Sequence, residues 1–392
     1  MASDIRLLQS KAFSSRSPQA ALAAVFLFVS AGTMVAQDLD NTQSTVRRSV
    51  SRDLLSDAEW QRVEVAVDRG LAFLSRQRLP KGSYQSNDEF EPGITGLCSL
   101  AFLSRGHLPG QGPYGDELEA TIQYIVGCQR TNGMIADRVH VKYATYSHPI
   151  GALVLSELYG MAPITDEDRI RTAINKAIHF TSLRVSQPKV TPGDEGSWRY
   201  LERHNNRDGD LSITSWNMVF LRSAKNAGFD VNAELIEEGL AYVKRLYSPK
   251  NKTFYYLYNE PEVTQRGLHR SMAGAGILSL ALAGEHHSEM AKTAARFLLD
   301  HPYTSYEIPR YNPREYLAYG AFYSSVGMFQ MGGEYWDGFY PQFIQLVLKA
   351  QHPDGSWYSD RSKESAYGHA YVTALTILAL TPPYQMLPVF QR

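Results

Sequence analysis

Cysteine is scarce in this sequence, which contains only Cys98 and Cys128 among its 392 residues. Two cysteines can form neither a disulfide framework nor a four-cysteine zinc ribbon, so the fold must depend on a packed core. A single bridge between Cys98 and Cys128 is one interpretation, and a pair of buried free thiols on helical apolar faces is the other.

An excess of charge of either sign is also missing. The chain has 39 Lys and Arg residues against 40 Asp and Glu residues, a formal net charge of -1. Proteins that bind nucleic acids carry a basic surface that attracts phosphates, so nucleic acid is not expected as a partner. The hydrophobic fraction of 44% is typical of globular proteins and is sufficient for a large core.

One long, weakly polar to apolar run is present near the N-terminus, from Ala20 to Ala36. Three basic residues precede it, Arg6, Lys11 and Arg16, and a polar, acidic stretch follows it. That order is typical of a secretory signal peptide over residues 1 to 36, so we predict cleavage after Ala36 and a secreted or periplasmic protein. An uncleaved membrane anchor is the alternative.

The chain contains an internal repeat. Its clearest copy lies near the C-terminus, where Gln351 is followed by Gly355 and then by Trp357. Partial copies lie at Gln77, Gly82 and Tyr84, at Gln129, Gly133 and Ile135, at Gly196 and Trp198, and at Asn251, with a degenerate copy at 294 to 298. The turn residues recur about every 50 to 60 residues, which indicates six repeats, the fifth of them degenerate.

Each repeat pairs two kinds of helix. A helix with a charged face, such as 57 to 76 or 166 to 184, precedes the turn, and a helix that is apolar nearly all round and rich in small residues follows it. Such a unit cannot close its own core, so neighbouring repeats must stack. After a flexible segment at 37 to 56, we predict one all-α domain over 57 to 392, an α/α toroid in which six inner and six outer helices form a closed α6/α6 barrel. An open solenoid is the alternative.

The segment from Gln351 to Trp357 resembles the QW repeat of the terpenoid cyclase and protein prenyltransferase superfamily, which includes the squalene-hopene cyclases. The resemblance covers residues 60 to 385 and implies a toroid with a central cavity, whose active groups stand at the N-terminal ends of the inner helices. The residues themselves predict that each Gln satisfies free backbone groups at a helix end while the aromatic ring packs in the next turn.

Polar residues stand at one equivalent position before the inner helices. They are Glu91, Tyr146, Asp210, His269 and Glu315, with His148 and His369 close by in their own repeats. In a closed ring these residues lie at one mouth of the cavity, where the helix N-termini add partial positive charge. Helix capping is the competing interpretation for the acidic members of the set.

The cyclases of the resembled superfamily carry an Asp-x-Asp-Asp motif whose middle acid protonates an isoprenoid alkene. The matching segment here begins at Asp208 and continues with Asp210, but Leu211 replaces the last Asp. The resemblance therefore makes Asp210 the candidate acid and removes one neighbouring carboxylate that would set its acidity. The zinc site of the protein prenyltransferases requires a cysteine in the last repeats, where this chain has none, so that activity, a metal and a cofactor are not expected.

An inserted loop directly before Asp208 contains Arg199, Arg203, His204 and Arg207. These basic residues would bind a carboxylate or phosphate, or pair with the nearby acids. The candidate catalytic residues are Asp210, Asp208, His269, Glu315, His148 and His369, and the candidate binding residues are Glu91, Tyr146, Arg203, Arg207, Tyr316 and Trp216.

Three functions are consistent with these residues. The leading hypothesis is an exported protein that binds or transforms a small hydrophobic, isoprenoid-like ligand. The second is an extracellular polysaccharide lyase or hydrolase that uses Arg, His and carboxylates across the mouth. The third is a non-catalytic binding or scaffold protein. A monomer is expected, and association with a membrane surface is left open.

Overall fold

The computed structural model of this chain describes residues 54–86, 90–137, 142–161, 166–259, 270–306, 316–358 and 363–392. Contacts divide the chain into two units, Met1–Ser56 and Asp57–Arg392, and the second holds every helix described below. The predicted signal peptide lies outside the described residues. No helix among the residues described is long and apolar enough to cross a membrane.

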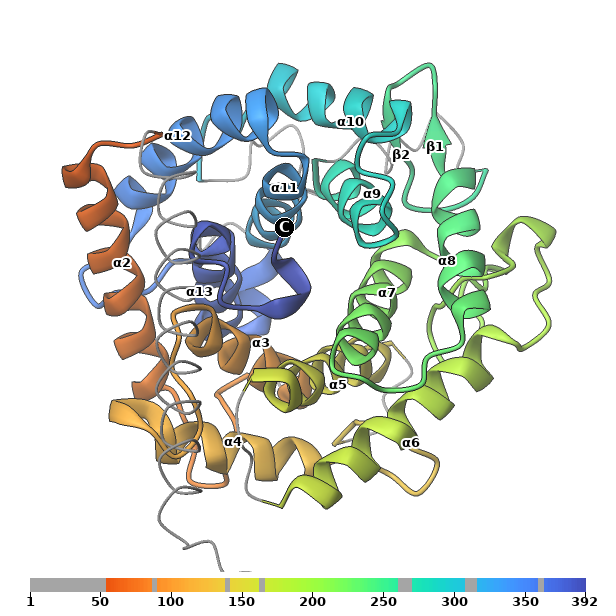
Figure 1. Ribbon diagram of the computed structural model, residues 1–392, viewed down its shortest axis with the longest axis horizontal. Helices are drawn as coiled ribbons and strands as arrows, with labels where there is room; N and C mark the ends of the chain where they lie inside the picture. The colour runs from red at the N-terminus through yellow and green to blue at the C-terminus, as the bar shows by residue number, and fades with distance from the viewer. Residues whose placement is uncertain are drawn as a thin grey trace, which may run out of the picture. The chain divides into compact units, whose positions relative to one another are not determined.

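Helices of two kinds alternate along the second unit and form a ring, which Figure 1 shows from one end. The outer helices within the described residues are α2 (Asp57–Arg76), α4 (Gly115–Gly127), α6 (Glu167–Val185), α8 (Ala233–Arg245), α10 (Glu289–Asp300) and α12 (Gly333–Ala350). The inner helices are α3 (Glu91–Ser104), α5 (Ala144–Met161), α7 (Leu211–Asn226), α9 (Arg270–Leu282), α11 (Leu317–Met331) and α13 (His369–Leu380). For the part of the chain that the structure describes, the predicted all-α toroid is confirmed.

The inner helices are buried on all sides, whereas the outer helices bury one face. Every residue of α3 is buried, whereas α8 and α10 keep charged residues on their exposed faces. Small residues let neighbouring inner helices approach closely, since a Cβ at Gly274 of α9 would lie 2.5 Å from the Ser324 nitrogen of α11. Cys98 and Cys128 are free thiols, with Cys98 fully buried.

The turn glycines of the repeats have the same environment in four places. Gly133 and Gly355 both have a φ of 94°, a left-handed conformation that favours glycine. A Cβ at Gly133 would lie 2.2 Å from the carbonyl oxygen of Lys176 in α6, and one at Gly355 would lie 2.4 Å from that of Arg69 in α2. Gly82 and Gly196 abut α4 and α8 in the same way. Each turn therefore packs directly against the outer helix of the next repeat.

The repeated glutamines also bridge consecutive repeats. Gln129 Nε2 donates to Gly133 O at 3.1 Å and to Ala173 O of α6 at 2.8 Å. Gln351 Nε2 donates to Gly355 O at 2.9 Å and to Ala66 O of α2 at 2.8 Å. The contact that joins the second repeat to the third therefore also joins the last repeat to the first, so the ring is closed and the open-solenoid alternative is wrong.

The fourth repeat uses a different turn. Asn251 was expected in the glycine position, but Lys252 is the residue with positive φ, at 55°. The turn is part of a short antiparallel hairpin of β1 (Tyr247–Ser248) and β2 (Thr253–Phe254). The degenerate fifth copy, residues 294 to 298, lies within α10.

The C-terminal tail packs against the inner helices. Its two 3-10 helices, η5 (Pro382–Tyr384) and η6 (Pro388–Phe390), pack against α5, α7, α11 and α13. Gln330 Nε2 donates to Phe390 O at 2.7 Å, and Phe390 packs edge-on against Phe322 at 5.9 Å. In Figure 1 the tail (dark blue) lies inside the ring of helices. It therefore covers one end of the inner barrel.

A buried carboxyl group holds this tail. Glu157 of α5 is 1% exposed, and its Oε1 accepts a hydrogen bond from Ser223 Oγ at 2.5 Å. Its Oε2 accepts one from the backbone N–H of Val389 at 3.3 Å. Burial raises the pKa of Glu157 to about 7, against the opposing effect of these two donors.

This carboxyl group predicts a pH dependence of stability. Because the folded pKa is higher than the unfolded one, the contribution of Glu157 is complete below about pH 4.5 and is lost as the pH rises through about 7. We expect Glu157→Gln to flatten the plot of unfolding free energy against pH between 5 and 8, by an amount on the order of 2–3 kcal/mol. Parallel plots for the two proteins would contradict the prediction.

Candidate functional site

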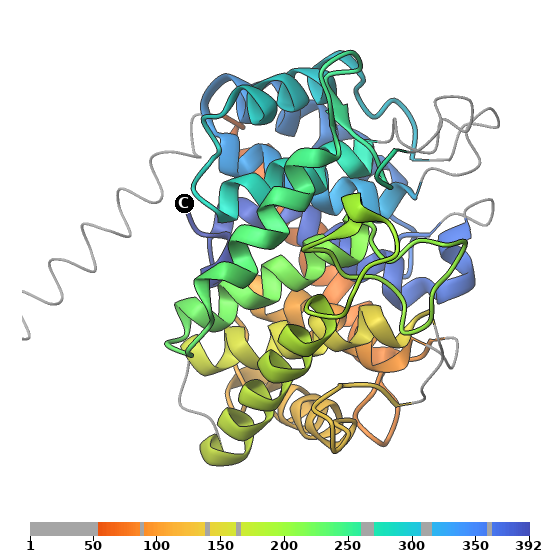
Figure 2. The same ribbon diagram turned by 90° about the vertical axis from the view of Figure 1, so that its right-hand side faces the viewer.

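A cavity of about 450 Å³ lies at the N-terminal ends of the inner helices. It is lined by residues near the start of each of them, including Gly93, Tyr146, Ser212, Ser271 and Tyr371. Figure 2 shows the ring from the side, with the inserted loop of residues 186 to 210 (yellow-green) and η4 (Lys363–Tyr367, dark blue) projecting on one side. The chain end marked C lies on the opposite side. The mouth and the tail therefore belong to opposite ends of the ring.

Aromatic side chains make up most of the lining. The described tyrosines there are Tyr143, Tyr146, Tyr200, Tyr256, Tyr316, Tyr319, Tyr367 and Tyr371. Phe90 packs against Tyr143 and Tyr367, with ring centroids 3.9 and 4.6 Å apart, and joins them in one wall. Trp216 also lines the cavity and stacks on Phe322 at 5.3 Å. Of the described lining residues, Lys142 alone carries a charge.

The tyrosine hydroxyl groups are neutral donors and acceptors. Tyr319 OH and Ser212 Oγ form a hydrogen bond of 2.6 Å. Burial raises the pKa of Tyr319 and of Tyr146 above the ordinary value for tyrosine. The cavity therefore combines ring faces for an apolar ligand with scattered hydroxyl groups that can orient one.

Asp210 lies immediately behind this lining. It precedes α7 and is fully buried, and its Oδ1 accepts a hydrogen bond from the backbone N–H of Ile213 at 2.8 Å, so it caps the helix. Burial raises the pKa of the Asp210 carboxyl, while Arg199, the Ile213 N–H and the Tyr256 hydroxyl oppose the shift. Tyr256 lines the cavity, so the acid is one side chain away from it.

Arg199 is the charged partner of Asp210. Its Nη1 lies 3.8 Å from Asp210 Oδ2 and donates to Gly209 O at 3.1 Å. Its guanidinium also lies over the rings of Tyr200 and Tyr256, at 5.1 and 5.8 Å. Burial acts against the charged form, but the Asp210 carboxylate raises the pKa of Arg199. Arg199 directly follows the buried Trp198 in the chain. The course of the inserted loop then places its guanidinium beside Asp210.

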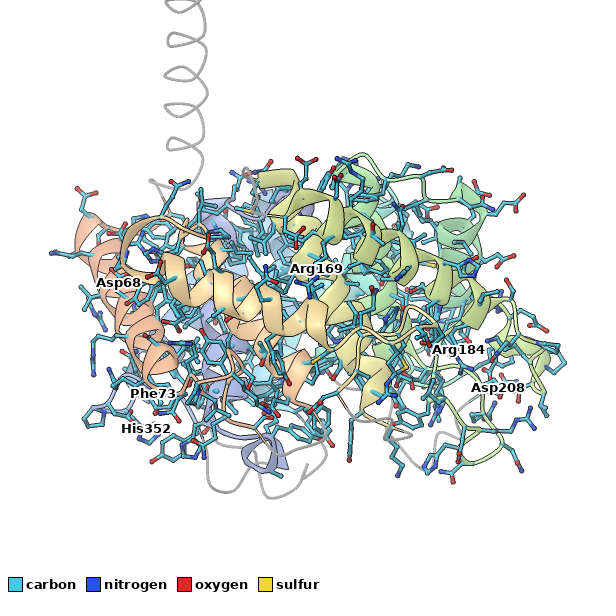
Figure 3. The ribbon with its side chains drawn as sticks, turned by 90° about the horizontal axis from the view of Figure 1, so that it is seen from below. Asp68, Phe73, Arg169, Arg184, Asp208 and His352 are labelled. Atoms are coloured by element: carbon cyan, nitrogen blue, oxygen red, sulfur yellow. The ribbon has the colours of Figure 1, made fainter. Side chains whose placement is uncertain are left out.

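Asp208 and the neighbouring arginines organise the inserted loop. Asp208 Oδ1 accepts from Arg203 Nε at 3.0 Å, and Oδ2 accepts from the Val190 N–H at 2.7 Å. Burial alone would raise the pKa of Asp208, but the hydrogen bonds from Val190 and Arg203 outweigh it, so the pKa is lowered. Figure 3 shows Asp208 near Arg184 at the periphery of the ring. Asp208, Arg203 and Arg207 are not among the described lining residues.

Two predicted rim residues point away from the cavity. Glu91 forms an ion pair with Lys81, at 2.7 Å from Oε1 to Nζ, and also accepts a hydrogen bond from Ser83. His148 Nδ1 accepts from the Ile135 N–H at 3.1 Å, and its Nε2 is 2.9 Å from Thr181 Oγ1. Burial lowers the pKa of His148 to about 3, so the ring is neutral and joins α5 to the turn at Ile135 and to α6 at Thr181.

His369 lies on the surface. Its ring stacks on Tyr358 at 3.9 Å, and Tyr358 stacks in turn on His352 at the same distance. Figure 3 shows His352 beside Phe73 of α2, at the closure of the ring. The other two rim candidates, His269 and Glu315, lie outside the described residues. Of the predicted binding residues, Tyr146, Tyr316 and Trp216 do line the cavity.

Sequence reasoning missed most of the tyrosines and one buried acid. Paired tyrosines three or four residues apart at the starts of inner helices, such as Tyr143 with Tyr146 and Tyr367 with Tyr371, are the signal that could have found them. The acid is Glu364 of η4, which accepts hydrogen bonds from the backbone N–H groups of Ala318 and Tyr319, at 3.1 and 2.9 Å. It anchors the N-terminus of α11 beside the cavity. No group of three or more His, Cys, Asp or Glu residues in the described ranges could hold a metal ion.

Comparisons with known proteins support the fold. No family model matches the chain, and no curated protein matches it. A structurally characterised protein from Actinoplanes is similar, with a TM-score of 0.55 and 16% identity over 81% of this chain and 98% of that one. A variant of the type II terpene cyclase MstE from Scytonema, in complex with its product merosterolic acid A, has a TM-score of 0.36 and 12% identity over 85% of this chain and all of that one (100%). At 16% identity, the likeness to the Actinoplanes protein concerns the fold alone.

Proposed function

We propose that this protein binds a small hydrophobic, isoprenoid-like ligand in the tyrosine-lined cavity, as a member of the terpenoid cyclase and prenyltransferase repeat superfamily. The composition of the lining carries the proposal. A volume of about 450 Å³ is within the range of small-molecule sites, which are mostly apolar with a few placed polar groups. Phe90, Trp216 and the tyrosine rings provide the apolar surface, and the tyrosine hydroxyls provide the polar groups.

The same lining is the reason that the carbohydrate-active alternative is not preferred. A polyuronide lyase needs arginines and a base that face an open groove, together with carboxylates in a hydrolase. Among the described lining residues there is no carboxylate and no arginine. The scaffold alternative predicts that no small ligand binds, so the ligand test below also decides between it and the proposal.

Asp210 is the group we propose as proton donor if the bound ligand carries an alkene. Burial raises the pKa of its carboxyl group and so makes protonation easier, whereas the Arg199 guanidinium, 3.8 Å from Oδ2, opposes this shift. The Tyr256 hydroxyl, next to Asp210, connects it to the cavity. The resemblance of the segment from Asp208 to Leu211 to the cyclase acid motif supports the same role. We also propose export, supported by the apolar run from Ala20 to Ala36 behind its basic residues.

Filling the cavity tests the proposal. Ile94 lines the cavity and is 1% exposed, so Ile94→Trp would place an indole in the ligand volume. By calorimetric titration with farnesol, we expect binding by the unmodified protein and an affinity loss of about tenfold or more in the variant, equivalent to about 1.4 kcal/mol.

The matched control is Val65→Trp, because Val65 is 52% exposed on the outer helix α2. We expect this variant to bind farnesol like the unmodified protein. Equal affinities for all three proteins would show that the ligand does not occupy the cavity. Failure of the unmodified protein to bind farnesol or other apolar ligands would favour the scaffold alternative.

A further inference from the structure

The charge of the cavity wall is concentrated at one point. Lys142 is the charged side chain among the described lining residues, and it stands two residues before α5. None of the ion pairs between described residues involves Lys142, and the hydrogen bond from Thr145 Oγ1 goes to its backbone carbonyl oxygen and not to its ammonium group. An ammonium group at the edge of an aromatic cavity, without a carboxylate partner in the part of the chain that the structure describes, is available to a ligand.

Other cations lie on the same side of the mouth. Burial lowers the pKa of His204, and Lys142 and Arg199 both add to this effect because their charges are near the ring. The His204 ring also contacts that of Tyr200, a lining residue, at 5.6 Å. Arg199 is compensated by Asp210, at 3.8 Å, whereas no described carboxylate compensates Lys142. The local excess of positive charge therefore lies at Lys142.

The start of α5 adds to this field. Its first turn contains no acidic residue, and it contributes Tyr146 to the lining, with Tyr143 just before it. By contrast, Asp210 accepts from the first turn of α7, and Glu364 accepts from that of α11. A helix N-terminus favours negative charge, and here it stands beside the unpaired Lys142 ammonium.

We propose that the ligand is amphipathic and carries one anionic head group, which binds Lys142 at the start of α5 while its apolar body occupies the tyrosine-lined cavity. This inference depends on the proposed function and makes it more specific, because it names the chemical class of the ligand. A carboxylate and a phosphate head share the required chemistry. Charge-assisted hydrogen bonds from the ammonium, together with tyrosine hydroxyl donors, would hold either of them.

Four probes with the same twelve-carbon chain test the head group directly. Laurate and dodecyl phosphate are anionic, dodecanol is neutral, and dodecyltrimethylammonium is cationic. Titrations below micelle-forming concentrations should show that an anionic probe binds the full chain about tenfold or more tighter than dodecanol. In Lys142→Met, which keeps the length of the side chain, this preference should disappear while dodecanol affinity is unchanged. The matched control is Lys225→Met, at the exposed C-terminal end of α7, which should retain the preference.

The outcomes separate the two proposals. If dodecanol binds as tightly as both anionic probes, or if the cationic probe binds best, the anionic head group is wrong and the apolar cavity stands. If Lys142→Met weakens all probes equally, the role assigned to Lys142 is wrong. If the unmodified protein binds none of the four, both this inference and the proposed function fail. A preference for dodecyl phosphate over laurate, or the reverse, identifies the head within the proposed class.

Discussion

Trp357→Ala is expected to lower the free energy of unfolding by about 3–5 kcal/mol, because it removes a large buried aromatic side chain and leaves a cavity. Trp357 is 0% exposed, and its Nε1 donates to Val347 O at 2.9 Å. Its ring packs on Gly70 of α2, where a Cβ would lie 2.7 Å from Trp357 Cζ3. The side chain therefore fills the interface between the last repeat and the first. Denaturant unfolding followed by circular dichroism measures the loss.

The matched control for this substitution is Trp198→Ala, inside the ring. Trp198 Nε1 donates to Thr181 O at 2.9 Å, and its ring packs on Gly239 of α8 in the equivalent way. In a closed ring the two interfaces are alike, so the two losses should agree within about 1 kcal/mol. A loss at Trp357 that is less than half the loss at Trp198 would mean that the seam is frayed and that the ring opens there.

Asp210→Ala is the second substitution with a large expected effect, a loss of about 3–5 kcal/mol, because it breaks a buried charge pair and leaves Arg199 uncompensated. It also removes the hydrogen bond that Asp210 accepts from the Ile213 N–H at 2.8 Å. Asp210→Asn keeps an oxygen for this cap, and Asn is a favourable capping residue, so its loss should be smaller. Thermal unfolding of both variants measures the difference.

The same pair of variants tests the proposed proton transfer. In deuterium oxide the Asp210 carboxyl carries a deuteron, and its O–D bond breaks as a C–D bond forms on the alkene. The resulting carbocation becomes neutral by losing a proton from a neighbouring carbon to the Asp210 carboxylate or to solvent, so the product retains deuterium, which mass spectrometry detects. We expect incorporation with the unmodified protein and none with Asp210→Asn, although the latter should still bind the ligand. Incorporation that persists in Asp210→Asn would remove the acid role from this residue. Binding without incorporation in the unmodified protein would leave a ligand-binding protein without this chemistry.

Much of the fold could be predicted because its determinants are local and repeated. A glycine and a glutamine four residues before it specify one turn, followed two residues later by a large apolar side chain, Ile135 or Trp357. Gly133 and Gly355 show that the turn recurs with the same positive φ and the same kind of neighbour. The even burial of the inner helices was likewise readable from composition, since a helix that is apolar on all faces must be enclosed. Closure into a ring then follows from the identical contacts of successive repeats.

The candidate site was predicted less well, because the position of a residue at a helix start does not determine where its side chain points. Tyr146 turns into the cavity, whereas Glu91 turns to Lys81 and His148 turns to Thr181. For Glu91 and His148, a partner that lies outside the inner helix satisfies the polar group. The pattern of the inner helix alone does not reveal that partner. Asp210 was predicted as the candidate acid at the mouth of the cavity, whereas the structure buries it behind the lining, and Arg199 was assigned to a basic loop rather than to Asp210.

The C-terminal tail after Leu380 was predictable in one respect and not in another. Two prolines after Leu380 end α13, and this could be read from residue types because proline cannot continue a helix. The destination of the tail depends on Glu157, which is 232 residues away from Val389 in the chain. By itself, the sequence determined the helices and their repeat, since these arise from local patterns, and it favoured a ring that the contacts of Gln351 and Gly355 with α2 then closed. Only the tertiary structure decided which polar groups face the cavity and what covers the far end of the barrel, because those contacts join residues that no local pattern connects.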